Sequence, residues 1–318
     1  MNSWRVMIAD GLHEAGINLL GKGTQVENLT GISGEELLNK INEYDALIVR
    51  GRTKVTREVI NAASKLKVIG RSGVGVDNID VAAASEKGII VVNAPSATTT
   101  AVAELTIGLL FSLVREIPRA DASMKRGEWM KKELMGVELF GKILGIIGFG
   151  RIGSTVGQIA AAAGLHIMAC GDFIIPETIR IIGGELLAME DILEKSDFIT
   201  IHTPLTEKTR GMVNADTIAR MKDGVYLICT ARGGVINEKD LLDALNSGKV
   251  AGAALDVFDC EPPFFPDLIN HPNFIATPHI GGQTHEAQKR ASIDIAKEVM
   301  ASLKGEKLHW EITLEGSD

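Results

Sequence analysis

Short apolar runs alternate with amphipathic segments along the chain, and this pattern predicts a succession of strands and helices. The apolar runs of the first 97 residues predict strands at Val6–Ile8, Ala46–Val49, Lys67–Gly70 and Ile89–Val92. Helices are expected at Leu12–Leu20 and after Ser33, where Glu36 completes a capping-box pattern. The succession is typical of a flavodoxin-like, doubly wound parallel sheet, in which ligands bind beyond the carboxyl ends of the strands.

The middle of the chain departs from this rhythm. Residues 98–115 have the apolar density of a buried helix, and another helix is expected to start at Pro118. This density suits a helix inside a core as well as a helix at a dimer interface. The segment 127–138 is charged and loop-like, and a solvated surface is the simplest interpretation of its charges.

The βα rhythm resumes at Lys142 and continues to the last helix. The predicted strands are Leu165–Cys170, Phe198–His202, Val225–Thr230 and Ala251–Val257, and the predicted helices are Ala215–Met221, Glu238–Leu245 and Glu286–Leu303. Because 318 residues exceed the usual size of one core, we expect two domains. If the last helix returns to the first sheet, residues 1–97 and 285–318 form a discontinuous domain, and residues 98–284 form an inserted one. The predicted fold class is α/β, with two Rossmann or flavodoxin-like doubly wound parallel sheets.

Near the start of the second domain, the apolar run 143–147 predicts a strand. Glycines spaced as G-x-G-x-x-G follow it, namely Gly148, Gly150 and Gly153. A helix rich in small residues follows, and Asp172 lies roughly 20 residues past the glycines, after the next predicted strand. This order is typical of a dinucleotide-binding βαβ unit, in which the glycines permit a tight turn, close approach of a pyrophosphate and close helix packing. Asp172 would accept hydrogen bonds from a ribose 2′-hydroxyl and repel a 2′-phosphate, which favours NAD over NADP.

The composition narrows the function classes. A net charge of −8 argues against general binding to nucleic acid or to anionic membranes. Three cysteines without metal-ligand spacing suit a reducing cytoplasm, and no metal site is expected. The N-terminus lacks the apolar core of a signal peptide, and the apolar run 105–114 is too short to span a bilayer.

Three later segments each place one ionisable group at the end of an apolar run, beside glycine or proline. These segments are 227–238 with Arg232, 252–263 with Glu261, and 276–282 with His279. Their ordered motifs, R-G-G-V-I-N-E, L-D-V-F-x-x-E-P and P-H-I-G-G, resemble those of the D-isomer-specific 2-hydroxyacid dehydrogenase family, and the resemblance covers nearly the whole chain. It places the family's catalytic arginine, glutamate and histidine on these three residues.

The residue types suit the chemistry that the resemblance implies. Oxidation of a 2-hydroxy acid moves a hydride to the nicotinamide and a proton from the hydroxyl to a base. His279 can exchange that proton near neutral pH. Glu261 can orient the ring and stabilise its protonated form, and Arg232 can hold a carboxylate with two parallel hydrogen bonds.

The resemblance also implies further contacts. Those to NAD are the three glycines together with Arg151, Ile152, Asp172, Thr203, Thr230, Asp256, His279 and Gly282. Those to the substrate are Arg232, Val74 and Gly75 in a glycine loop, the pair Arg50 and Arg52, and Lys131 from a neighbouring subunit. Two guanidinium groups beside a carboxylate pocket suit a phosphate, although surface arginines at a strand end are the plainer interpretation.

The resemblance is strongest to family members that oxidise D-3-phosphoglycerate to 3-phosphohydroxypyruvate, a step of serine biosynthesis, in a short form without their carboxy-terminal regulatory domains. Two alternatives stay open: a dehydrogenase for glyoxylate, hydroxypyruvate or another 2-hydroxy acid such as sulfolactate, and an NAD-responsive transcriptional corepressor. The resemblance further implies a cytoplasmic homodimer or homotetramer that dimerises through residues 99–140, with no nucleic-acid or membrane partner.

Overall fold

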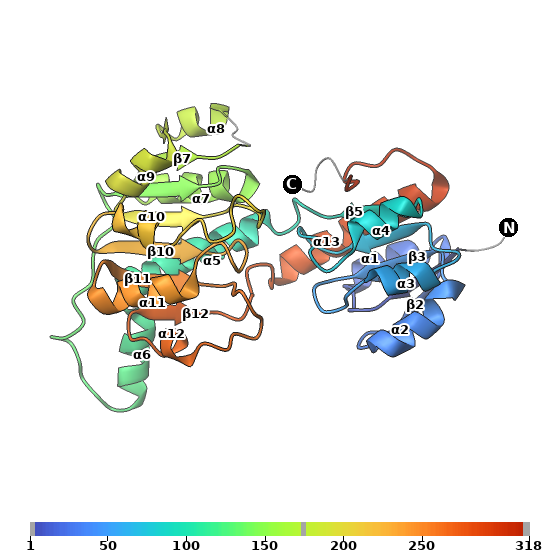
Figure 1. Ribbon diagram of the computed structural model, residues 1–318, viewed down its shortest axis with the longest axis horizontal. Helices are drawn as coiled ribbons and strands as arrows, with labels where there is room; N and C mark the ends of the chain where they lie inside the picture. The colour runs from blue at the N-terminus through green and yellow to red at the C-terminus, as the bar shows by residue number, and fades with distance from the viewer. Residues whose placement is uncertain (1–3, 173–175, 314–318) are drawn as a thin grey trace. The chain divides into compact units, whose positions relative to one another are not determined.

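The computed structural model describes residues 4–172 and 176–313 of the chain. The chain divides into two compact units, one formed by Met1–Thr98 with Gly282–Asp318 and the other by Thr99–Gly281 (Figure 1). Within the described residues, no helix combines the length and the apolar character that a membrane crossing requires.

The first unit is built on a five-stranded sheet in the order β2-β1-β3-β4-β5, with all its strands parallel. Its strands are β1 (Trp4–Ile8), β2 (Thr24–Asn28), β3 (Ala46–Val49), β4 (Val68–Arg71) and β5 (Ile90–Asn93). Its helices are α1 (Glu14–Leu20), α2 (Gly34–Lys40), the 3-10 helix η1 (Ile41–Glu43), α3 (Arg57–Ala62), α4 (Val81–Glu86) and α13 (His285–Lys304). This order is the flavodoxin-like one, and its switch point lies between β1 and β3.

Both faces of this sheet are buried, because alternate residues of each strand point to opposite sides. On one face Met7, Leu47 and Ile69 pack with residues of α2, α3 and α4. On the other face Ile8 and Ile48 pack with residues of α1 and α13. The helix that the chain supplies last, α13, thus completes the core of the unit that the chain begins first.

A further segment closes the free edge of this sheet. After α13 the chain returns along β5, where Glu311 pairs with Val92 in antiparallel fashion. The N–H of Asn93 donates to the carbonyl of Trp310, and the N–H of Ile312 donates to the carbonyl of Val91. The last described residues of the chain therefore contact the strand whose carboxyl end faces the loop 73–75.

The second unit is built on a seven-stranded parallel sheet in the order β12-β11-β10-β9-β6-β7-β8. Its strands are β6 (Ile143–Ile147), β7 (His166–Cys170), β8 (Glu185–Leu186), β9 (Phe198–Ile201), β10 (Val225–Cys229), β11 (Val250–Leu255) and β12 (Phe274–Ala276). Its helices are α5 (Thr99–Val114), α6 (Ile117–Lys125), α7 (Arg151–Ala162), α8 (Pro176–Ile181), α9 (Met189–Lys195), α10 (Ala215–Ala219), α11 (Glu238–Ser247) and α12 (Pro266–Ile269). Counted from β6, this is the Rossmann order, and its switch point lies between β6 and β9.

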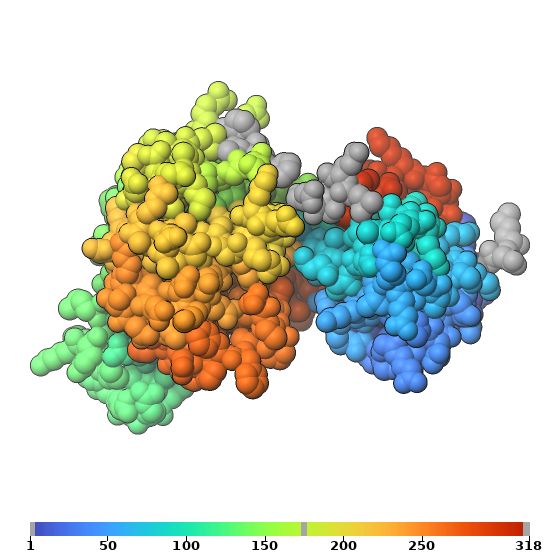
Figure 2. Space-filling model, viewed as in Figure 1, coloured from blue at the N-terminus to red at the C-terminus, as the bar shows by residue number. Residues whose placement is uncertain are grey.

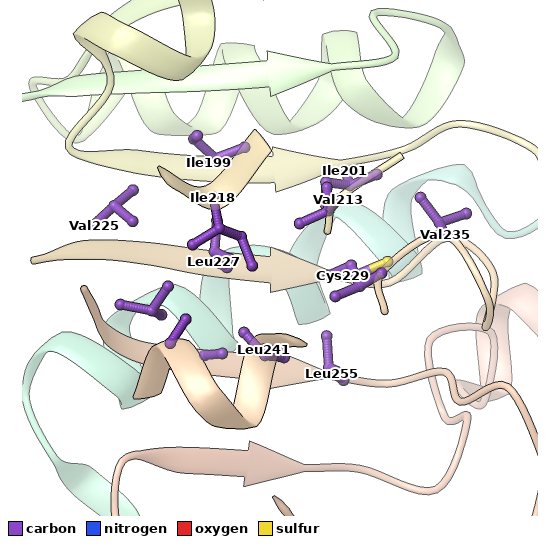
Figure 3. Close-up of a cluster of buried hydrophobic side chains, with 14 of the residues drawn as sticks. Ile199, Ile201, Val213, Ile218, Val225, Leu227, Cys229, Val235, Leu241 and Leu255 are labelled. Carbon is purple, nitrogen blue, oxygen red and sulfur yellow. The ribbon is translucent and has the colours of Figure 1, made fainter. Parts of the chain in front are cut away.

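Helices cover both faces of this sheet as well. On one face, Ile199, Leu227 and Leu255 from three neighbouring strands meet Ile218 of α10 and Leu241 of α11 (Figure 3). On the other face the apolar side chains of α5 and α7 pack on β6, β7 and the far side of β10. The α/β fold class with two doubly wound parallel sheets is therefore confirmed.

The capping box that the sequence predicts at Ser33 and Glu36 is also present, with both of its hydrogen bonds formed. The sequence analysis did not identify several short elements, namely β2, β8, β12, α3, α4, α8, α9 and α12. The strands among them lie at sheet edges, where one side faces solvent and no continuous apolar run is needed.

Candidate active site

The glycine loop lies at the switch point of the seven-stranded sheet, between β6 and α7. Gly148 has a φ of +96°, and a Cβ there would lie 2.7 Å from the carbonyl of His202. A Cβ on Gly153 would lie 2.1 Å from the carbonyl oxygen of Gly148. Both positions therefore require glycine for the turn and for the packing of α7 on the sheet.

Gly150 differs from the other two glycines because, apart from its chain neighbours and its own helix, no atom of the described residues lies within 4 Å of the place its Cβ would occupy. Gly150 is the N-cap of α7 and offers no side chain to the N–H groups of the first turn, which begins with Arg151 and Ile152. An uncapped helix N-terminus beside open space is suited to a pyrophosphate. Asp172, two residues after the neighbouring strand β7, is exposed. The residues present therefore fit a dinucleotide.

Three other predicted cofactor contacts lie at the ends of strands or at the unit boundary. Thr203 follows β9 at the switch point, and its hydroxyl lies 3.8 Å from Sδ of Met212. Thr230 follows β10, and its hydroxyl lies 2.8 Å from that of Thr106 on α5. Gly282 belongs to the first unit, next to the boundary.

His202, beside Thr203, is a residue that the sequence analysis passed over. Both of its ring nitrogens are shielded from solvent and have no hydrogen-bond partner among the described residues. Burial lowers the pKa of the His202 ring to about 3, so the imidazole is neutral at pH 7. Its position directly after an apolar strand was the available signal.

His279 and Glu261, two of the three predicted catalytic residues, form a hydrogen-bonded pair with 2.8 Å between Nδ1 and Oε2. Burial raises the pKa of the Glu261 carboxyl, but the His279 hydrogen bond and charge, the N–H of Phe258 and the charge of Arg232 outweigh burial and leave the pKa below its usual range. Glu261 is therefore ionised at neutral pH.

Arg232, the third predicted catalytic residue, follows β10 in the same unit. One of its Nη atoms donates to the carbonyl of Ala231 at 2.7 Å. Its charge acts on the Glu261 carboxylate, as the lowered pKa of that group records. The structure therefore brings Arg232, Glu261 and His279 into one electrostatic group within the second unit.

Asp256 holds the loop that carries His279. Its carboxylate is buried, with 1% of the residue exposed, and accepts from the Thr277 hydroxyl at 2.6 Å and from the N–H groups of Ile280 and Gly281 at 2.8 Å each. His279 between them has a φ of +52°, a value that is uncommon for a residue with a side chain. Asp256 therefore holds the backbone on either side of His279.

The two predicted substrate arginines, Arg50 and Arg52, differ in their surroundings in the first unit. Nε of Arg52 pairs with Oδ1 of Asp10 at 3.1 Å, and an Nη of Arg52 donates to the carbonyls of Ala9 and Ile32. Among residues 4–172 and 176–313, the Arg50 guanidinium has one weak hydrogen bond, 3.4 Å to Oε1 of Gln283. Burial lowers the pKa of Arg50, with the charge of Asp10 acting in the opposite direction. Arg50 is thus the better placed of the two to meet an anion.

Asp10 was not identified from the sequence, although an acid just after an apolar strand was a usable signal. It lies at the switch point of the first sheet and accepts the N–H groups of Arg50 and Thr53 at 2.8 and 3.0 Å. Asn78 donates to the carbonyls of the same two residues at 2.9 and 2.6 Å. The hydrogen bonds of Asp10 and those of Asn78 together hold the loop that carries Arg50.

The glycine loop 73–75 follows β4 in the first unit. Gly73 has a φ of +147°, and a Cβ there would lie 1.5 Å from Nη1 of Arg71. The Arg71 guanidinium therefore covers this loop, and the sequence analysis missed it. Lys131, the remaining predicted substrate residue, is exposed in the second unit, in the segment after α6. Within the described residues no cluster of three or more histidine, cysteine or acidic side chains could hold a metal ion.

Comparison with known proteins identifies the class to which this fold and these motifs belong. Residues 107–281 match the NAD-binding domain of the D-isomer specific 2-hydroxyacid dehydrogenases. Because this match covers more than half of the chain, the chain belongs to the D-isomer specific 2-hydroxyacid dehydrogenase family, and NAD is its cofactor.

Relatives within the family are similar over nearly the whole chain. The chain is 50% identical over 303 residues to D-3-phosphoglycerate dehydrogenase of Methanocaldococcus jannaschii and 46% identical over 308 residues to that of Homo sapiens, which covers 95% and 96% of the chain. It spans 58% of the length of each of these relatives. The crystal structure of a glyoxylate reductase from Paecilomyes thermophila is 31% identical, with a TM-score of 0.90 over 99% of this chain and 100% of that one.

Proposed function

We propose that the chain catalyses the NAD-dependent oxidation of D-3-phosphoglycerate to 3-phosphohydroxypyruvate. The observation that carries the proposal is the contact of 2.8 Å between Nδ1 of His279 and Oε2 of Glu261, in the NAD-binding domain of a dehydrogenase family. The identity of 44–50% to phosphoglycerate dehydrogenases supports the choice of acid.

The proton assignment follows from the ionised state of Glu261. A carboxylate only accepts hydrogen bonds, so Nδ1 of His279 carries the proton of this pair, and the neutral ring offers the lone pair of Nε2 to the substrate. Nε2 would take the proton from the substrate hydroxyl, and Glu261 would stabilise the resulting imidazolium. Arg232 would hold the substrate carboxylate and polarise the developing carbonyl. NAD, when bound, accepts the hydride from C2.

We propose the roles of the cofactor residues from the fit of the glycine loop and Asp172 to a dinucleotide. The N–H groups at the start of α7, around Gly150, Arg151 and Ile152, would bind the pyrophosphate, with Gly148 forming the turn and Gly153 allowing α7 to approach. The other proposed NAD contacts are Asp172, Thr203, Thr230, Asp256, His279 and Gly282. The first unit would supply the substrate side through Arg50, Val74 and Gly75.

The test replaces His279 by alanine. We expect His279→Ala to lose at least about 100-fold in kcat, since general acid–base catalysis contributes that much, while NADH, titrated by fluorescence, still binds. His166→Ala is the matched control, because His166 is exposed at the amino end of β7 and should leave both quantities unchanged. Near-wild-type turnover by His279→Ala would overturn the assignment.

The choice of acid needs its own experiment. A reductase of glyoxylate or hydroxypyruvate is the second candidate, supported by the similarity to the glyoxylate reductase structure. NADH formation with D-3-phosphoglycerate, D-glycerate, D-lactate and glycolate separates the two. A kcat/KM that is highest for the phosphorylated acid supports our proposal, and equal values for glycerate and phosphoglycerate would contradict it.

We also propose a homodimer. Large apolar side chains are exposed on α5, α6 and the segment that follows them, namely Phe111, Ile117, Met124, Trp129, Met135 and Phe140. The segment that carries α6 projects from the rest of its unit as the green region of Figure 2. An exposed apolar group of this kind is typical of an interface, and a dimer would offer Lys131 to a second copy. Light scattering of Trp129→Ser together with Phe140→Ser should report a monomer; an unchanged mass would contradict this interface.

We also propose that the protein is located in the cytoplasm, because free cysteines are typical of a reducing compartment. Cys170, Cys229 and Cys260 are all free thiols, and burial raises the pKa of the Cys229 thiol to about 11. Disulfides would be expected in an oxidising compartment. Fractionation of cells that express the tagged chain tests the location, and recovery in an exported fraction would contradict it.

A further inference from the structure

The loop 73–75 is tied back to the end of β5 through its carbonyl groups. The carbonyl of Gly73 accepts the N–H of Ala94 at 2.9 Å, and the carbonyl of Val74 accepts Nδ2 of Asn93 at 2.6 Å. Asn93 is the last residue of β5, with only 5% of its surface exposed. Two consecutive peptide groups are therefore fixed by hydrogen bonds from one side.

This arrangement determines where the N–H groups of the loop point. In a trans peptide the carbonyl and the following N–H point in opposite directions. Since the carbonyls of Gly73 and Val74 point to the end of β5, the N–H groups of Val74 and Gly75 point away from it. Across residues 4–172 and 176–313, neither of these two N–H groups has a hydrogen-bond partner. Two adjacent free N–H groups beside the Arg71 guanidinium are suited to an anion.

Asn93 is itself held on its other side. Its N–H donates to the carbonyl of Trp310 at 3.1 Å. Glu298 of α13, which is 4% exposed, accepts the N–H groups of His309 and Trp310 at 2.9 and 3.2 Å. The segment 309–312 therefore supports the backbone of Asn93, and the side chain of Asn93 supports the loop.

We propose that Asn93 is a positioning residue for the substrate. By holding the Val74 carbonyl, Asn93 aims the N–H groups of Val74 and Gly75 at the carboxylate of the 2-hydroxy acid. The inference rests on the proposed function, because it takes this loop as the carboxylate site. It assigns to Asn93 no direct contact with the substrate; the side chain acts through the Val74 peptide.

The test is Asn93→Asp, which keeps the size of the side chain but replaces the donor by an acceptor that faces the Val74 carbonyl. The peptide should rotate, and the acid should bind more weakly in the ground state and the transition state alike. We expect a rise of about tenfold in KM for the acid, the equivalent of one lost hydrogen bond to a charged group, with kcat within about threefold. The Kd of NADH, measured by fluorescence, should not change, because its proposed contacts lie almost wholly in the other unit.

Two further measurements keep the result interpretable. Asn18→Asp adds the same charge at an exposed position of α1 in the same unit and should leave KM unchanged. Asn93→Ala removes the donor without adding a charge, and its KM should rise as well. A melting temperature measured for each variant confirms that the protein compared is folded. An unchanged KM in a folded Asn93→Asp, or a loss confined to kcat, would overturn the proposal.

A binding experiment separates this proposal from the proposed function. Oxalate carries carboxylates but no hydroxyl to oxidise, so its affinity in the presence of NADH, measured by calorimetry, does not depend on turnover. Weaker oxalate binding by Asn93→Asp than by the wild type supports the role of Asn93 whichever acid the wild type oxidises. Equal oxalate affinities would overturn it, even if D-3-phosphoglycerate proves to be the substrate.

Discussion

Nε of Arg52 lies 3.1 Å from Oδ1 of Asp10, and this ion pair turns the Arg52 guanidinium back toward its own unit. Arg50, two residues earlier, shares the Asp10 carboxylate only through its backbone N–H. Two arginines that form one motif in the sequence therefore have different tasks. Arg52 helps to hold the loop, whereas we propose that Arg50 meets a second anionic group of the substrate.

This difference leads to a first prediction. Arg50→Ala should raise KM for 3-phosphohydroxypyruvate by about tenfold, the value of one lost charge-assisted hydrogen bond, and should leave KM for hydroxypyruvate nearly unchanged. Arg52→Ala should instead lower the free energy of unfolding by about 1 kcal/mol or less, since its side chain is half exposed. Steady-state kinetics with both acids and chemical denaturation measure the two effects. A larger change in KM for Arg52→Ala would show that Arg52 meets the phosphate.

A second prediction concerns the orientation of His279. In Asp256→Asn, the amide group cannot accept both the Ile280 and the Gly281 N–H groups, so the loop should shift. A displacement of about 1 Å at a catalytic group can lower kcat by about 100-fold. Thr277→Val removes a single hydroxyl contact and serves as the milder control. If Asp256→Asn weakens NADH binding but leaves kcat intact, Asp256 acts as a cofactor contact alone.

The three glycines of the loop offer a third prediction, because only one of them faces open space. Gly150→Ala should keep the melting temperature, since its Cβ would meet no other segment among the described residues and its φ of −79° suits any residue. The same variant should weaken NADH binding by about tenfold or more, equivalent to about 1.4 kcal/mol. Gly153→Ala should instead destabilise the fold by about 1–3 kcal/mol through overpacking against Gly148. A Gly150→Ala variant that binds NADH normally would contradict the pyrophosphate site.

A fourth prediction follows from the pKa of His202. Burial lowers this pKa from 6.5 to about 3, so the unfolded chain binds this proton at a higher pH than the folded chain does. The stability that depends on a neutral His202 is therefore complete above pH 6.5 and is lost progressively as the pH falls toward 3. At pH 4 the loss should be on the order of 3 kcal/mol. Denaturation of His202→Phe at pH 7 and pH 4 measures it, and a pH dependence equal to that of the wild type would contradict this source.

The parts of the fold that the sequence predicted well are those with a continuous apolar run. At the switch point of the second sheet, β9 is buried throughout and β6 at all but its first residue, so an apolar run identified both strands. β2 carries the polar side chains of Gln25, Glu27 and Asn28 on an edge strand, and no apolar run distinguishes it from a loop. An edge strand is determined by pairing with its neighbour, which the local sequence does not encode.

In the candidate site, too, the sequence predicted residues in local motifs but not the contacts that form only in the folded chain. Arg232, Glu261 and His279 were found because each lies in a distinctive motif. The pairing of Arg52 with Asp10 joins residues 42 positions apart, and the contact of Asn93 with Val74 joins residues 19 positions apart. Such contacts form only when the strands are side by side, so the motifs identified which residues matter without telling which of them face the substrate.

The position of α13 has a consequence for synthesis of the chain. Residues 1–98 leave the ribosome before residues 99–281, and Ile295 and Val299 of α13, which cover Gly70 of β4, leave it only after them. The face of the first sheet that α1 and α13 share therefore stays only partly covered while the whole of Thr99–Gly281 emerges and can fold. The apolar surface that α13 covers stays exposed until a helix some 200 residues further along the chain has been made. We therefore expect nascent chains of this protein to depend on chaperones during that interval.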